Sequence, residues 1–133
     1  MLEIKNETGK KIENVNFIAL ETYGFDNMKN IYNDVTISNE KRQKIVFSSN
    51  DMPAHSNELW LYFRDSEDNI TVALINACWE VPSKNRSTLW IKMDGDRYKF
   101  KSKVLFEGMH TRDMEYTNEL IEAIASKGGE ESR

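Results

Sequence analysis

The chain has 133 residues, with 18 basic and 22 acidic side chains and a net charge of −4. This length predicts one domain, and the 39% of hydrophobic residues supply enough apolar surface for a folded core, which excludes a wholly disordered chain. Two histidines and a single cysteine, Cys78, exclude an internal disulfide framework and leave few ligands for a zinc site. We therefore expect a binding protein that is not an enzyme and carries no cofactor.

The charge is distributed unevenly along the chain. Residues 1–83 carry 8 basic and 13 acidic side chains, whereas residues 84–104 carry seven basic and two acidic ones, a balance of +5. We expect a binding partner to contact this basic segment, so the charge of the segment matters more for binding than the net charge of the whole chain. No apolar run is long enough for a transmembrane helix, and the first residues lack the apolar stretch of a signal peptide. These features predict a protein that is cytoplasmic or released without a signal peptide.

Apolar and polar residues alternate with a period of two from residue 2 to about residue 106, which predicts seven or eight short strands. In chain order, the expected strands contain Leu2 and Ile4; Val15, Phe17 and Ala19; residues 32–37; residues 45–47; residues 59–63; residues 70–75; residues 89–93; and residues 98–106. The fifth and sixth of these are apolar on both faces, and the fifth is expected at the centre of a sheet. Asp94 and Gly95 predict a tight hairpin between the last two.

The pattern changes at about residue 111, where apolar residues begin to recur every three or four positions. This spacing predicts one amphipathic helix over about 111–127, followed by a flexible tail at 128–133. The apolar stripe of the helix must dock on a sheet, on a sandwich edge or on a partner. We therefore expect residues 1–127 to form a single antiparallel β-sandwich of seven to eight strands with a C-terminal helix, and the alternative is a barrel closed at one end by the helix.

Few residues are candidates for catalysis or metal binding. Cys78 with His55 or His110 is the only thiol–imidazole pairing that the chain can form, but Cys78 follows a strand that is apolar on both faces, where cysteine is usually a buried hydrophobe. One acidic turn resembles the opening of a calcium loop but lacks the glycine and closing glutamate of an EF-hand. This weaker metal candidate consists of Asp65, Glu67 and Asp68.

Basic and aromatic residues gather around the expected last hairpin. Lys99, Lys101 and Lys103 share one face of its second strand and lie next to Trp90 and Lys92 if the hairpin pairs as expected. Such a face can meet anionic lipid or phosphate, and it is equally typical of a plain solvent face that protects an edge strand. The acidic net charge argues against a nucleic-acid partner. The candidate lipid- or partner-binding residues are Trp79, Trp90, Lys84, Arg86, Lys92, Lys99, Lys101 and Lys103.

The segment from Trp79 to Trp90, WEVPSKNRSTLW, resembles the tryptophan-rich strand–loop–strand of the aegerolysins, which are small acidic haemolysin-like β-sandwich proteins. Residues 4–15 resemble the opening strand pair of that family and residues 45–49 its middle strand, so the similarity spans about residues 2–106. Ser83 stands where the family tends to place another aromatic residue. The resemblance implies a single sandwich that binds membrane lipids, often containing sphingolipid, and that can recruit a larger pore-forming partner.

Two hypotheses follow for the function. The first is a non-enzymatic, aegerolysin-like protein that binds lipid membranes as a component of a pore-forming toxin system. The second is a small acidic cytosolic module that binds a protein, such as an immunity or inhibitor protein. The expected partner is thus a membrane lipid or a larger protein, and the pattern does not indicate an oligomeric state.

Overall fold

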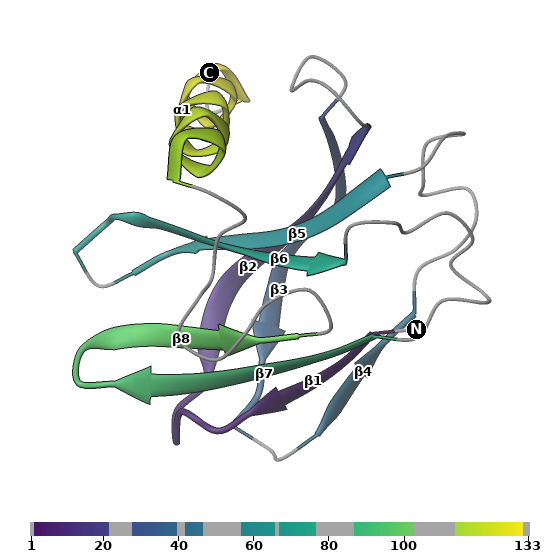
Figure 1. The fold of residues 1–133 in the computed structure, drawn as a ribbon, viewed down its shortest axis with the longest axis vertical. Coiled ribbons are helices and arrows are strands. Elements are labelled where there is room, and N and C mark those ends of the chain that lie inside the picture. Colours follow the sequence, from purple (N-terminus) through teal and green to yellow (C-terminus); the bar gives the residue numbers. More distant parts are fainter. Residues whose placement is uncertain are drawn as a thin grey trace.

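The computed structural model describes residues 2–21, 28–39, 42–46, 57–65, 67–76, 87–102 and 114–131. In chain order these residues form β1 (Leu2–Asn6), β2 (Ile12–Glu21), β3 (Lys29–Ile37), β4 (Gln43–Ile45), β5 (Asn57–Arg64), β6 (Ile70–Asn76), β7 (Ser87–Asp94), β8 (Arg97–Lys101) and α1 (Met114–Glu131) (Figure 1). The strands make two four-stranded sheets, β4-β1-β7-β8 and β3-β2-β5-β6. The predicted mainly β class with a C-terminal helix is confirmed, and the arrangement is consistent with a β-sandwich.

The prediction of a wholly antiparallel fold is wrong for one strand pair. β1 and β7 run parallel, with Ile4 opposite Leu89 and Lys5 opposite Trp90, so their sheet is mixed. Alternation in the sequence indicates which side chains are buried, but it is the same whether a strand pairs parallel or antiparallel. Here the chain passes to the other sheet after β1, and β1 is flanked by β4 and β7, which come later in the chain.

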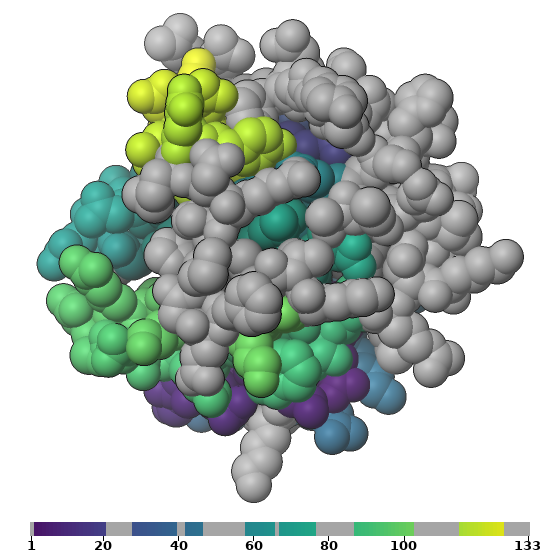
Figure 2. Space-filling view, viewed as in Figure 1, coloured from purple at the N-terminus to yellow at the C-terminus, as the bar shows by residue number. Residues whose placement is uncertain are grey.

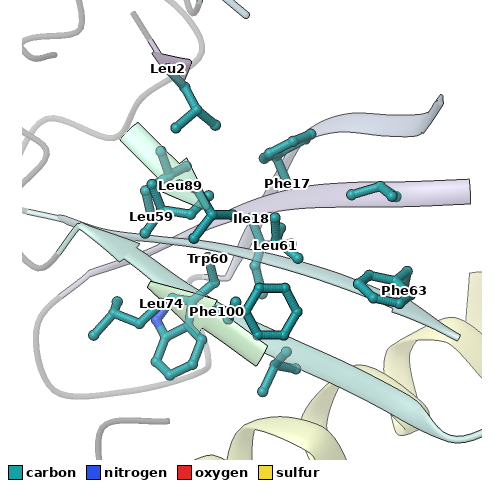
Figure 3. Packing of buried hydrophobic residues seen from close by; sticks show 14 of the residues in the cluster. Leu2, Phe17, Ile18, Leu59, Trp60, Leu61, Phe63, Leu74, Leu89 and Phe100 are labelled. Carbon is teal, nitrogen blue, oxygen red and sulfur yellow. The ribbon is translucent and has the colours of Figure 1, made fainter. Parts of the chain in front are cut away.

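The inward-facing residues of both sheets form the core (Figure 3). Phe63 of β5 meets Tyr98 of β8 edge-on, with ring centroids 4.9 Å apart, and lies 6.4 Å from Phe100. Leu59 and Leu61 are completely buried. Each such apolar side chain stabilises the fold by roughly 1.5–3 kcal/mol.

Polar side chains join the two sheets at both sides of the sandwich. On one side, the backbone N–H of Ser38, just after β3, donates to Gln43 Oε1 of β4 at 2.9 Å. On the other side, Asn76 Nδ2 of β6 donates to Ser87 Oγ of β7 at 2.9 Å. These bonds satisfy polar groups that would otherwise be costly to bury, and they link sheets that share no backbone ladder.

Helix α1 docks on the outer face of the second sheet, at β5 and β6 (Figure 1). Leu120 and Ile124 are buried, and the ring of Tyr116 stacks on Trp60 at 6.1 Å. The buried carboxylate of Glu58 accepts hydrogen bonds from Tyr116 Oη at 2.6 Å and from Trp60 Nε1 at 3.2 Å. The helical pattern left open whether the helix docks on a sheet, on a sandwich edge or on a partner, and in the structure it docks on a sheet.

The helix extends to Glu131, beyond the predicted end at about 127, and takes in part of the expected tail. Gly128 and Gly129 each weaken a helix by roughly 1 kcal/mol without forbidding its backbone geometry, so they do not end it here. Among the described residues, no helix has the length and apolar content needed to cross a membrane.

Candidate functional site

The hairpin between β7 and β8 brings the predicted basic residues together. Gly95 has a φ of 64°, which suits the first central position of a two-residue hairpin turn between Asp94 and Arg97. The register then places Trp90 opposite Lys101 and Lys92 opposite Lys99. The predicted hairpin and the shared face of these residues are confirmed, but the turn consists of Gly95 and Asp96, one residue later than the predicted pairing across Asp94 and Gly95.

Trp90 lies between two lysines that come from different ends of the chain. Lys5 Nζ of β1 is 5.2 Å from the centroid of the indole ring, and Lys101 Nζ of β8 is 5.4 Å from it. A lysine ammonium over an exposed aromatic face contributes about 0.5–1 kcal/mol. The half-buried indole thus holds two cationic side chains at the outer surface of its sheet.

The outer surface of β4, β1, β7 and β8 forms what we call the basic face. Its members share a direction because each is paired in register with another outward residue, and they alternate along their strands with residues that point into the core. The basic face consists of Lys5, Lys44, Trp90, Lys92, Lys99 and Lys101.

Carboxylates on the same surface are fewer and are already paired. Glu3 Oε1 lies 2.9 Å from Arg42 Nε, and Asp94 Oδ2 lies 3.3 Å from Lys99 Nζ. Exposed ion pairs of this kind contribute only about 0–1 kcal/mol and are screened by salt. The lysines therefore outnumber the acidic groups, so the described part of this face presents positive charge to a partner although the whole chain is acidic.

Of the predicted binding residues, the structure brings together Trp90, Lys92, Lys99 and Lys101. The other predicted binding residues, Trp79, Lys84, Arg86 and Lys103, lie outside the described residues. The thiol–imidazole candidates Cys78, His55 and His110 also lie outside them. The expected pairing of Trp79 with Trp90 therefore stays a prediction.

Sequence reasoning missed Lys5 and Lys44 as members of this face. Both belong to strands that join the hairpin sheet through long-range pairing, Lys5 opposite Trp90 and Lys44 opposite Glu3. The local signal was present for Lys5, because it follows the buried Ile4 and must point outward. The pairing of Lys5 with Trp90 on β7 could not be predicted, because no local pattern specifies parallel pairing between distant segments.

The acidic turn proposed as the weaker metal candidate forms a self-contained loop. Asp65 Oδ1 accepts the backbone N–H groups of Glu67 and Asn69, both at 2.9 Å, and Arg64 Nη1 approaches Asp68 Oδ1 at 3.7 Å. Within the described parts of the chain, no three carboxylate, imidazole or thiolate groups lie close enough to share a metal ion. The carboxylate of Asp65 therefore stabilises the turn through hydrogen bonds to its backbone.

Comparison of the chain with protein-family models, with curated proteins and with solved structures finds no match. The geometry of the site therefore carries the functional argument.

Proposed function

We propose that this protein is a non-enzymatic membrane-binding protein whose basic face meets a layer of anionic lipid headgroups, with Trp90 at the interface. The observation that carries the proposal is the placement of Trp90 between Lys5 and Lys101, at 5.2 and 5.4 Å, on the outer side of its sheet. Indole prefers the membrane–water interface because it combines an apolar body with one hydrogen-bond donor. Lysines beside it would meet the headgroup phosphates.

The charge of the basic face is large enough for such binding. Each lysine held near an anionic leaflet contributes about 1 kcal/mol, so the four lysines of the basic face other than Lys99, which is paired with Asp94, together supply several kcal/mol before the indole is counted. This attraction acts over about 10 Å at 0.1 M salt, so the acidic residues on distant surfaces oppose it only weakly.

The aegerolysin resemblance supports the same proposal from the sequence. The segment 77–86, which carries Trp79, Lys84 and Arg86, directly precedes β7, the strand that holds Trp90. In the proposal these residues extend the binding surface beyond the described part of the basic face. The further step, recruitment of a larger pore-forming partner, belongs to the aegerolysin hypothesis and would follow membrane binding.

Vesicle flotation tests this function. The whole chain is mixed with vesicles of neutral phosphatidylcholine, of phosphatidylcholine with about 30% phosphatidylserine, and of phosphatidylcholine with sphingomyelin, at about 50 and 500 mM salt. We expect flotation with the anionic vesicles at low salt and its loss at high salt. Lys5→Gln and Lys101→Gln should each lower the partition coefficient about fivefold, since each removes about 1 kcal/mol.

The matched control is Lys29→Gln, which removes the same charge from an exposed position on β3 of the other sheet. It should leave partitioning unchanged. The proposal would be overturned if the folded wild-type chain floated neither with the anionic vesicles nor with the sphingomyelin vesicles. Equal losses in Lys5→Gln and Lys29→Gln would also overturn it. Retention by immobilised acidic protein in place of vesicles would instead favour the alternative of a protein-binding module.

A further inference from the structure

A second candidate site lies at one end of the sandwich, next to the β7–β8 turn. The link between β1 and β2, the β5–β6 turn and the β7–β8 turn surround a cavity of about 680 Å³, which we call the end cleft. A second hollow of about 410 Å³ adjoins it, and the two share Asp65, Asp96, Arg97 and Tyr98. Figures 1 and 2 show the tips of the β5–β6 and β7–β8 hairpins next to each other at this end. Cavities of this size are typical of small-ligand sites.

The geometry points to the end cleft as a binding site for a neutral, hydroxyl-rich ligand, namely a short oligosaccharide. Such a site is distinct from the membrane function proposed above, because the larger hollow is lined by turn residues and by Phe63 and Tyr98 and contains no member of the basic face, although the second hollow reaches Lys99. Three features of the cleft favour such a ligand: its floor, its rim and its rigidity.

The floor of the end cleft is aromatic. Tyr98 lines both hollows and is half-buried, and Phe63 packs edge-on against its ring at 4.9 Å. The ammonium of the exposed Lys10 lies over this ring, 5.3 Å from the Tyr98 centroid, and Phe100 stacks on the ring at 6.4 Å, so a sugar reaches a face of Tyr98 where the flexible Lys10 side chain moves aside. An aromatic ring of this kind offers an apolar surface for the C–H face of a sugar, and a flexible lysine beside it can donate to a hydroxyl.

The rim of the end cleft is polar and has no net charge. Four basic and four acidic side chains line it, and Asp96 and Arg97 lie where the two hollows meet. Because both signs are equally represented, the rim offers a ligand with a net charge no net electrostatic attraction. Sugar hydroxyls both donate and accept, so they can use the carboxylate oxygens and the guanidinium donors at the same time. Two adjoining hollows suit a ligand longer than one sugar ring.

Two of the turns around the end cleft are fixed by their own hydrogen bonds. Asp65 ties the β5–β6 turn through its carboxylate and also through its backbone N–H, which donates to the Asn69 carbonyl at 2.9 Å. In the β1–β2 link, Asn6 Nδ2 donates to the Lys10 carbonyl at 2.8 Å, and Thr8 Oγ1 donates to Asn6 Oδ1 at 2.6 Å. A rim that is already ordered binds a ligand with a smaller loss of entropy.

Saturation-transfer NMR on the whole chain tests this site. The probes are neutral di- and trisaccharides of glucose, galactose, mannose and N-acetylglucosamine, with choline chloride, inorganic phosphate and a neutral tripeptide as separate arms, each at about 5 mM. We expect signal transfer to at least one saccharide. Arg97→Gln and Asp96→Asn should each weaken that binding about tenfold, since each replaces a charged hydrogen-bonding group by a neutral one.

Both variants lie in an exposed turn and should keep the fold, which circular dichroism checks. Lys29→Gln on the opposite sheet is the control and should leave saccharide binding unchanged. Binding of no saccharide by the folded chain would overturn the inference. So would binding that neither variant weakens, or binding restricted to choline, phosphate or the peptide. Because vesicle flotation depends on the basic face, failure of one test leaves the other standing.

Discussion

Trp60 and Trp90 occupy equivalent places in the two sheets and have opposite surroundings. Each alternates along its strand with residues that point into the core, so each lies on the outer face of its sheet. Trp60 is completely buried beneath α1, where its N–H donates to Glu58 and its ring stacks on Tyr116. Trp90 is half-buried and lies between two lysine ammonium groups. A tryptophan on an outer face therefore belongs to the core or to a binding surface according to what covers it.

The same contrast extends to the two outer faces as wholes. The face under α1 keeps its one described buried carboxylate, Glu58, hydrogen-bonded to two side-chain donors. The lysines of the basic face are exposed or half-buried at the outer surface of their sheet. Changes under the helix should accordingly act on stability, and changes on the basic face should act on binding.

Replacement of the covered tryptophan should have the largest effect. Trp60→Ala removes a completely buried side chain and should lower the free energy of unfolding by about 3–5 kcal/mol. Trp90→Ala removes a half-buried ring and its two lysine contacts, so about 1 kcal/mol is expected. Urea unfolding followed by circular dichroism measures both. Similar losses in the two variants would contradict the contrast between the faces.

Removal of the buried carboxylate should come next. Glu58→Ala leaves Trp60 Nε1 and Tyr116 Oη without their acceptor and should cost about 1–3 kcal/mol of unfolding free energy. Hydrogen exchange should rise in α1, because the bond from Tyr116 is one of its attachments to the sheet. Tyr116→Phe removes the donor alone, and the double variant should lose less than the sum of the single losses. Strict additivity would show that these groups act independently.

A change at the helix–sheet contact should raise stability. Thr117 is buried in α1, and its hydroxyl has no hydrogen-bond partner within the described residues. Thr117→Val keeps the shape, has a similar helix propensity and removes the unsatisfied polar group, so we expect a gain of about 1 kcal/mol. The midpoint of urea unfolding at unchanged slope measures this gain. A loss of stability would mean that the hydroxyl is satisfied.

The smallest effect on stability is expected on the basic face. Lys5→Gln removes the ammonium of a half-buried lysine from the indole of Trp90 and should change the unfolding free energy by about 0.5 kcal/mol, although it weakens vesicle binding about fivefold. Lys29→Gln serves as the control in the same unfolding experiment. A loss above about 2 kcal/mol in Lys5→Gln would place Lys5 in the structural core of the protein and not on a binding surface.

Local patterns in the chain account for much of the fold. The alternation around Leu89 and Ile91 correctly predicted a strand with Trp90 and Lys92 on its other face, and Asp94 with Gly95 predicted its hairpin. These features are local because side-chain direction alternates with a period of two and a tight turn needs only a few residues. The helical repeat that includes Leu120 and Ile124 likewise predicted the buried face of α1.

The amino-acid sequence by itself determined the mainly β class, most of the strand segments, the hairpin and the amphipathic helix, because each depends on neighbouring residues. Only the tertiary structure decided that β1 runs parallel to β7, that Lys5 therefore reaches Trp90, and that α1 covers Trp60. These outcomes join residues distant in the chain, and they depend on which surfaces pack together when both sheets bury their apolar faces. The same packing leaves one tryptophan beneath a helix and the other between lysines at the surface.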